Sequence, residues 1–362
     1  MGSEHIPRGK RIERFSPSLA NALIECPSRV AFSQDDRYSF LRRPSLASSL
    51  GNVAHAVFDR VLKQPIAAAD EAGISSELSE IWTEETSKEQ AELIDAWRPA
   101  HPPEPEEWPG YQLTRTRTLR RLERRVIDYR LAAQSGKPSM NSVDSERALE
   151  DSVSGLYGRP DRVDQTPNGI RLADLKTGLN QHEPTDAQRR QLLLYAVLVQ
   201  RNFKQWPIAL RIESSSGESW PVEYSPQDAE RALAEALVAV QDYNQNVDRD
   251  GATNNALPSC ENCRWCPYRG VCSPYWDALS VEWRHPSVRG EILEFGNTAA
   301  GTYLMIRVAS PKERQTELVN IRGLSIEVNA VGQQASIVDA ALTNDPSVFR
   351  GTWSTVVILE NA

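Results

Sequence analysis

The chain has 362 residues, 40% of them hydrophobic and 25% charged, which is enough for one large or two medium globular domains with their own cores. The formal net charge of −8 argues against a surface that coats nucleic acid nonspecifically, although a local basic channel remains compatible with it. No apolar run approaches the roughly 20 residues that a membrane-spanning helix requires, and residues 1–15 lack the apolar core of a signal peptide, so we expect a cytoplasmic protein without a membrane partner.

The N-terminal part of the chain predicts helices. Residues 16–34 begin with Ser16-Pro17, an N-cap followed by proline at the first helical position, and Cys26-Pro27 should end or kink this helix. Residues 48–63 predict an amphipathic helix with His55 beside its apolar stripe. Taken alone, Cys26 is a candidate buried thiol and His55 an ordinary helical residue.

A second long helix is expected over about 75–98, and a stiff, proline-rich connector follows it. The next helix, residues 111–130, carries many arginines and few acids. These arginines form a solvated face or, because guanidinium groups match phosphate geometry, a helix that follows a nucleic-acid backbone. The candidate nucleic-acid-binding residues are Arg115, Arg117, Arg120, Arg121 and Arg124.

The centre of the chain predicts a mixed sheet flanked by helices. Strands are expected at about 143–151, 156–165 and 170–177, near 207–213 and at 219–224, with helices over 185–201 and 228–247. The strands 156–165 and 170–177 are joined by Pro167-Asn168-Gly169. Asn-Gly between alternating runs is a strong hairpin signal, because both residues tolerate positive φ.

This hairpin would bring two carboxylates and an ammonium together. Side chains alternate along a strand, so Asp174 and Lys176 share one face. With an even-length loop, Asp161 lies on that face too, opposite Asp174 or Lys176 according to the register. Carboxylates suit Mg²⁺ or Mn²⁺, and Lys176 could orient an attacking water or stabilise charge in a transition state. The alternative is that these are turn, salt-bridge and surface residues, since Asp-x-Lys is common by chance.

Four of the five cysteines, Cys260, Cys263, Cys266 and Cys272, lie close together in the sequence. In a reducing compartment such crowding indicates metal ligation rather than disulfides. By themselves the four form a complete tetrathiolate that could hold Zn²⁺.

From residue 281 the pattern changes to short β-like runs separated by Gly or Asn. About 80 residues of this kind suit a small all-β domain, for which an oligonucleotide-binding (OB) barrel is one candidate. The region is not notably basic or aromatic, so a structural or partner-docking role is the other candidate.

Six motifs occur in one order along residues 16–276. They are Cys26-Pro27, Gly51-x-x-x-His55, Gly158-Arg159-Pro160-Asp161-Arg162-Val163-Asp164, Asp174-Leu175-Lys176-Thr177-Gly178, Gln191-x-x-x-Tyr195 and Cys263-x-x-Cys266-x₅-Cys272. This series resembles the PD-(D/E)XK nuclease superfamily, in particular its RecB-like branch with the AddB-type and CRISPR adaptation nucleases. The C-terminal β-region lies outside the resemblance.

The resemblance implies a restriction-endonuclease-like α/β fold and a Mg²⁺- or Mn²⁺-dependent deoxyribonuclease. It implies that His55, Asp161 and Asp174 bind the metal and that Lys176 is catalytic. Gln191 and Tyr195, one helical turn apart, would lie on the same side of their helix and face the site. The catalytic set is therefore Asp161, Asp174, Lys176, Gln191 and Tyr195.

The resemblance also implies a second metal centre, in which Cys26 joins Cys263, Cys266 and Cys272 around a [4Fe–4S] cluster. This arrangement leaves Cys260 spare, whereas the zinc alternative uses Cys260 in place of Cys26. The cluster would staple the start of the nuclease region to its end, and closing so long a loop should stabilise the fold.

We expect three parts: a helical region at 1–140 that arches over the catalytic sheet, a nuclease core at 141–280, and a β-rich domain at 281–362. The expected function is hydrolysis of single-stranded DNA, as an exonuclease or endonuclease, in DNA repair or anti-phage defence. The chain lacks a Walker motif, so any helicase would be a partner. The alternative is a non-cutting nucleic-acid-binding or scaffolding subunit of such a complex.

Overall fold

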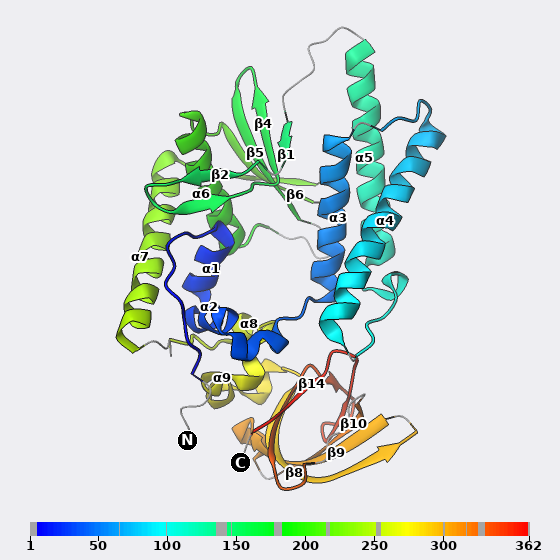
Figure 1. The fold of residues 1–362 in the computed structure, drawn as a ribbon, viewed down its shortest axis with the longest axis vertical. Coiled ribbons are helices and arrows are strands. Elements are labelled where there is room, and N and C mark those ends of the chain that lie inside the picture. The colour runs from blue at the N-terminus through cyan, green and yellow to red at the C-terminus, as the bar shows by residue number, and fades with distance from the viewer. Residues whose placement is uncertain are drawn as a thin grey trace.

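A helix-flanked sheet, a group of three long helices and a second sheet make up the molecule in the computed structural model (Figure 1). The structure describes residues 6–64, 66–98, 100–134, 143–145, 147–176, 183–214, 218–250, 255–299, 301–315, 317–324 and 330–360. None of the helices in these segments combines the length and apolarity that crossing a bilayer requires.

The chain begins with two short helices that meet at Cys26. These are α1 (Pro17–Glu25) and α2 (Pro27–Gln34). The Ser16 hydroxyl caps α1 by accepting a hydrogen bond from the Leu19 backbone N–H, and Cys26 has an extended backbone between the helices. Proline at 27 cannot donate the helical hydrogen bond that would continue α1, so it starts a new helix instead. The break expected at Cys26-Pro27 is confirmed.

Three long helices pack against one another and share a core. They are α3 (Leu46–Lys63), α4 (Glu71–Trp97) and α5 (Tyr111–Gln134), with the short 3₁₀ turns η2 (Asp36–Leu41) before them and η3 (Pro105–Glu107) between α4 and α5. Large apolar side chains such as Trp82, Leu93 and Leu122 are fully buried between them. The three helices that the sequence predicts here are confirmed, and α4 begins four residues earlier than expected because Asp70 caps it.

The central sheet is mixed and has five strands in the order β1-β4-β5-β6-β7. They are β1 (Val143–Ser145), β4 (Arg162–Thr166), β5 (Gly169–Lys176), β6 (Ala209–Ser214) and β7 (Ser219–Val222). β5 and β6 run parallel, and the other neighbours are antiparallel. The helices α6 (Asp186–Phe203) and α7 (Pro226–Asp250) pack with α1 and with one face of this sheet around a second core. The predicted mixed sheet flanked by helices is thus confirmed.

Two predicted strands are wrong in their extent. The strand expected at 143–151 is two short strands in different sheets, because β2 (Leu149–Asp151) pairs with β3 (Leu156–Gly158) and not with β4. The strand expected at 156–165 is interrupted between β3 and β4. Pro160 lies in the interruption and has no backbone N–H to donate to a neighbouring strand.

The predicted hairpin is confirmed as β4 and β5, and the loop between the strands is Pro167-Asn168. Gly169 has a φ of +132°, which explains the need for glycine there. The register pairs Arg162 with Ala173, and continuing it by one residue places Asp161 beside Asp174.

The C-terminal part contains a seven-stranded sheet in the order β12-β13-β10-β9-β8-β11-β14. Its strands are β8 (Ser287–Thr298), β9 (Gly301–Ser310), β10 (Leu318–Leu324), β11 (Gln334–Val338), β12 (Ala341–Leu342), β13 (Val348–Arg350) and β14 (Val356–Leu359). The short helical segments before and within it are α8 (Cys260–Arg264), η4 (Arg269–Val271), α9 (Ser273–Ala278), η5 (Val281–Trp283) and η6 (Lys312–Arg314). The small all-β part is confirmed, but an OB barrel has five strands, so an OB-like form is not shown.

Candidate active site

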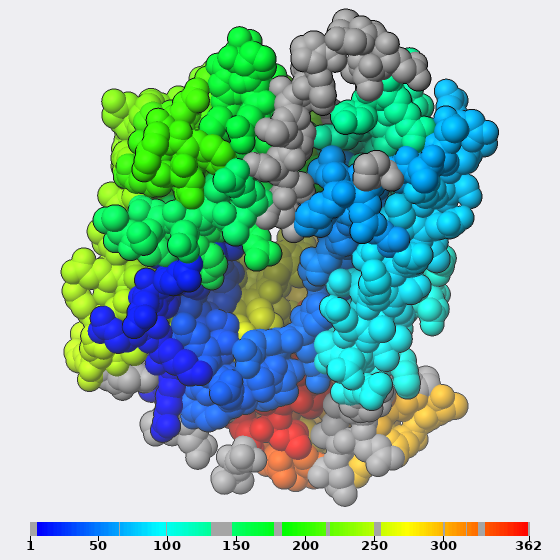
Figure 2. Space-filling model, turned by 45° about the horizontal axis from the view of Figure 1, so that its top comes forward, coloured from blue at the N-terminus to red at the C-terminus, as the bar shows by residue number. Residues whose placement is uncertain are grey.

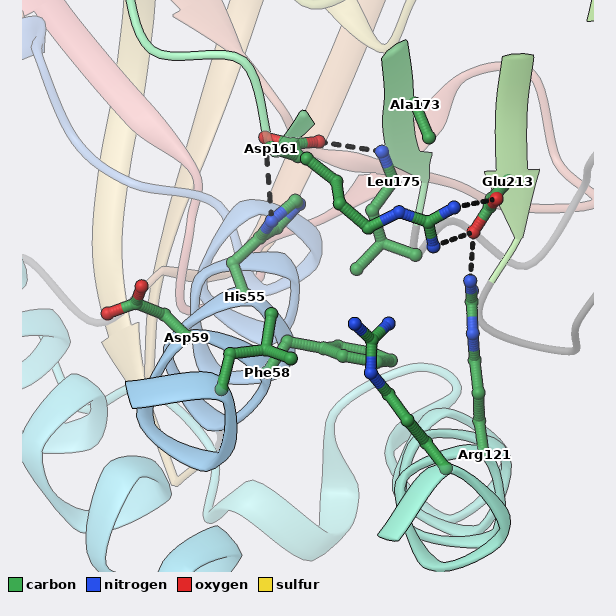
Figure 3. Close-up of a pocket in the computed structure, with 11 residues that line it drawn as sticks. His55, Phe58, Asp59, Arg121, Asp161, Ala173, Leu175 and Glu213 are labelled. Atoms are coloured by element: carbon green, nitrogen blue, oxygen red, sulfur yellow. Dashed lines mark hydrogen bonds and ion pairs between the residues drawn. The ribbon is translucent and has the colours of Figure 1, made fainter. Parts of the chain in front are cut away.

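The predicted catalytic carboxylates lie together at one end of the β4–β5 hairpin. Asp161 precedes β4, and one of its carboxylate oxygens accepts a hydrogen bond of 2.6 Å from the Leu175 backbone N–H. The other oxygen lies 3.9 Å from Nδ1 of His55, which projects from α3 (Figure 3). On β5, the Lys176 ammonium forms an ion pair of 2.7 Å with Asp174. The structure therefore gathers four of the predicted residues from three separate stretches of sequence.

The two predicted residues on α6 also face this site. Gln191 donates a long hydrogen bond of 3.4 Å to Asp174, and the Tyr195 hydroxyl donates one of 3.2 Å to the Arg159 carbonyl. Burial raises the pKa of Tyr195 to about 12, so the hydroxyl stays a donor. A Cβ at Gly158 would lie 2.8 Å from the Tyr195 ring. Glycine at 158 thus allows α6 to approach the segment that carries Asp161.

Asp161 and Asp174 lie close enough for the charge of Asp174 to disfavour ionisation of Asp161. Asp174 is only 3% exposed, and its Oδ2 atom has the Lys176 ion pair but accepts no hydrogen bond from any described residue. Burial, and secondly the charge of Asp174, raise the pKa of Asp161 to about 6, while His55 opposes the shift. A buried carboxyl group whose pKa is raised by burial and by a neighbouring carboxylate is typical of sites that hold a cation.

The donor set fits a hard divalent ion, since it offers carboxylate oxygens and one imidazole nitrogen. In the described residues, however, no group of three or more His, Cys, Asp or Glu side chains is already arranged as a metal site. His55, Asp161 and Asp174 are the candidate ligands because their donor atoms suit such an ion and because the three side chains lie near one another. Thr177 and Gly178 of the predicted motif lie outside the described residues.

The opposite face of the hairpin carries a network of arginines that the sequence analysis did not anticipate. Arg162 donates two hydrogen bonds, of 2.8 and 2.9 Å, to the Glu213 carboxylate on β6. Arg121 also pairs with Glu213, donates to the Ser214 carbonyl at 2.5 Å, and lies over the Phe58 ring (Figure 3). Arg121, a predicted nucleic-acid contact, is thus engaged inside the protein.

The remaining arginines of α5 differ in exposure. Arg120 and Arg124 are exposed, whereas Arg115 and Arg117 are partly buried. Arg125, which the predictions left out, borders the same cavity as His55 and Asp161. Its position four residues after Arg121 was the available signal, since residues i and i+4 lie on one side of a helix. No sequence motif pointed to Glu213.

Four cysteines from two ends of the nuclease region line one small cavity of about 20 Å³. They are Cys26, Cys263, Cys266 and Cys272. Burial, with smaller contributions from the neighbouring thiols, raises the pKa of Cys266 to about 11 and that of Cys272 to about 12. Cys260 does not line the cavity; it is exposed, and its sulfur lies 3.9 Å from Nε2 of His285. The structure thus groups Cys26 with three of the crowded cysteines.

A mixed sheet that presents an aspartate and an Asp-x-Lys pair at a hairpin end, covered by helices, defines a nuclease-type α/β domain. The sequence model of the PD-(D/E)XK nuclease superfamily matches residues 14–273, and the chain belongs to this superfamily. No curated protein matches the chain significantly. The matched region takes in the α3–α5 helices as well as the central sheet, and it ends just after the last crowded cysteine.

Proposed function

We propose that this protein is a Mg²⁺- or Mn²⁺-dependent deoxyribonuclease that hydrolyses single-stranded DNA. The observation that carries the proposal is the crowding of Asp161 and Asp174 beside the Lys176 ammonium. Superfamily membership supports a nuclease and a DNA substrate. The RecB-like branch, the preference for single strands and the choice of metal belong to the proposal.

Asp161 and Asp174, with His55, would hold the divalent ion. When bound there, such an ion supplies Lewis acidity, which lowers the pKa of a water and polarises a phosphoryl oxygen. The chain's own groups position the reactants: the Leu175 N–H and the Gln191 amide orient the two carboxylates. Lys176 brings a positive charge to the place where the phosphate becomes more negative in the transition state.

The path of the strand is proposed from the shape of the surface. Figure 2 shows the surface hollowed between the α1–α3 region and the central sheet. The exposed Arg120 and Arg124 on α5 would attract the DNA backbone, with Arg115 and Arg117 contributing as partly exposed groups. In this arrangement residues 1–140 act as an arch over the core at 141–280, and residues 281–362 form a separate β-rich part.

We also propose that Cys26, Cys263, Cys266 and Cys272 hold a [4Fe–4S] cluster with a structural role. Support comes from the cavity that these four cysteines share and from the place of Cys260 outside it. Tetrathiolate ligation is ordinary for such a cluster. Iron and acid-labile sulfide in anaerobically purified, brown protein would support it. A colourless protein containing zinc would instead assign a ligand role to Cys260.

The proposal extends to the cellular compartment and to a partner protein. Free thiols suit a reducing compartment such as the cytoplasm. A nuclease without its own motor would receive strands from a helicase partner, in repair or in anti-phage defence.

The test is the degradation of end-labelled single-stranded DNA by the purified protein in Mg²⁺ or Mn²⁺, with EDTA as the negative control. The Lys176→Ala variant should lose cleavage and keep its fold. Lys88→Ala removes an exposed lysine on α4 and should cleave like the wild type. Divalent-dependent cleavage that survives in Lys176→Ala would contradict the proposed site. A wild type that binds the strand without cutting it would favour the scaffolding alternative.

A further inference from the structure

A small cavity lies on the face of the hairpin opposite Asp174. The registers Arg162 to Ala173 and Leu175 to Glu213 place these side chains on one face, and alternation places Asp174 on the other. The cavity has a volume of about 40 Å³, room for more than one water-sized group. Its walls come from α3, α5 and the sheet, and both His55 and Asp161 border it (Figure 3). It therefore adjoins the candidate metal site.

The charged groups of the cavity can be paired off one by one. Glu213 is bound by Arg121 and Arg162. Asp59 forms an ion pair of 2.7 Å with Lys63. Asp161 faces His55 and belongs to the candidate metal site.

Arg125 is a cationic side chain of the cavity lining that takes part in none of these pairs. Arg125 makes no hydrogen bond and no ion pair with any residue in the described part of the chain, although it borders the cavity.

In the protein without a bound ligand, the charged form of Arg125 is electrostatically disfavoured at this position. Burial, and then the like charge of Arg162, lower the pKa of Arg125; Arg121 acts in the same direction, and Asp164 and Glu213 offset part of the effect. A partly buried cation without a hydrogen-bond partner gains the most from a ligand anion, because the anion meets it in a medium that screens poorly.

We propose that Arg125 binds a phosphate group of the nucleic-acid strand in this cavity, next to the metal site. This inference rests on the proposed nuclease function and adds a substrate contact to it. A guanidinium presents paired N–H donors that match two phosphate oxygens. The Arg121–Glu213–Arg162 network holds two further positive groups in fixed positions around the cavity, and the Arg121 guanidinium also contacts the Phe58 ring. The phosphate is either an internal phosphodiester or a terminal phosphate.

The experiment measures the binding of labelled single-stranded oligonucleotides to the full-length protein in EDTA, so that no cleavage occurs, over a range of salt concentrations. Arg125→Gln should weaken binding about tenfold and reduce the slope of log affinity against log salt by roughly 0.7. Arg125→Lys should fall between it and the wild type. Arg98→Gln is the matched control, because Arg98 is 73% exposed at the end of α4 and its contact with Asp95 is 3.7 Å long.

Oligonucleotides with a 5′-phosphate, a 3′-phosphate or neither separate the two sources of phosphate. A defect of equal size on all three assigns Arg125 to an internal phosphodiester, and a defect confined to one assigns it to that terminus. Thermal unfolding of the same variants distinguishes a structural role. Because Arg125 is repelled by Arg121 and Arg162, Arg125→Gln should unfold at the wild-type temperature or above it.

An Arg125→Gln variant that unfolds at a lower temperature and keeps the wild-type affinity and salt slope would overturn the inference, while leaving the nuclease proposal intact if the wild type cleaves DNA. A wild type that neither cleaves nor binds single strands would overturn both. The cleavage assay of the wild type thus separates the two failures.

Discussion

Two places in this molecule crowd together groups that repel one another when charged, and they do so by different means. At the hairpin end, Asp161 and Asp174 are held by hydrogen bonds from Leu175 and Gln191, and Asp174 pairs with the Lys176 ammonium. In the cysteine cavity, the thiols come from opposite ends of the nuclease region, and aromatic and apolar side chains line the cavity together with polar ones that include Arg29 and Arg269. Burial raises the pKa values at both places.

The difference fits the separate roles that we propose for the two places. The carboxylates are oriented by polar contacts and one of them, Asp161, remains partly exposed, as a site that must admit a substrate requires. Cys263 is buried and the other three thiols of the cavity are partly buried, and four such thiols suit the soft, structural centre that we propose there. Hard oxygen donors and soft sulfur donors also select different metals, so the two sites need not compete.

Disruption of the cysteine cavity should have the largest effect. With the proposed [4Fe–4S] cluster in this cavity, Cys266→Ser should lose iron and lower the free energy of unfolding by about 5 kcal/mol, by analogy with a crosslink that closes a long loop. Iron analysis and thermal denaturation check this result. Cys260→Ser should keep both iron and stability. The reverse outcome, with Cys260→Ser the damaged variant, would favour the zinc arrangement.

Neutralising Asp174 should abolish the function of the carboxylate site without harming the fold. Asp174→Asn keeps the size of the side chain and should reduce the cleavage rate by about 10²–10³-fold, comparable with the loss of one charge-stabilising group in other enzymes. Its unfolding temperature should stay close to that of the wild type, because the lost repulsion of Asp161 offsets the lost ion pair with Lys176. Cleavage close to the wild-type rate would refute the assignment.

A divalent ion should stabilise the folded protein by binding at the carboxylate site and not at the cysteine cavity. Mn²⁺ at about 100 times its dissociation constant should raise the free energy of unfolding by about 2.7 kcal/mol, seen as a higher melting temperature. Asp174→Asn should respond weakly or not at all, and the iron content should stay constant in both proteins. An equal shift in the wild type and in Asp174→Asn would place the ion elsewhere.

The smallest effect is expected at α6. Gln191 touches Asp174 through a hydrogen bond of 3.4 Å, which is long for a contact to a carboxylate. Gln191→Ala should therefore raise the activation free energy of cleavage by about 1 kcal/mol, which slows cleavage less than tenfold. The melting temperature should not fall. A loss as large as that of Asp174→Asn would mean that Gln191 contacts the substrate directly.

Much of the fold could be predicted because its determinants are local. Ser16-Pro17 and Thr185 start helices through caps that a few neighbouring residues complete. The alternation of β5 and the Asn168-Gly169 step produce the hairpin, and with it the shared face of Asp174 and Lys176. The errors in strand extent arose where Pro160 interrupts the pairing and where residues 143–151 divide between two sheets.

The sequence by itself determined the superfamily, since the superfamily's motifs depend on spacing within short segments and on their order along the chain. Only the tertiary structure decided which side chains meet across long separations. It paired Glu213 with Arg121 and Arg162, left Arg125 without a partner among the described residues, and placed Cys26 rather than Cys260 in the cysteine cavity. Such contacts depend on how whole helices pack against the sheet. This packing is determined by many side chains together, so no single sequence motif predicts it.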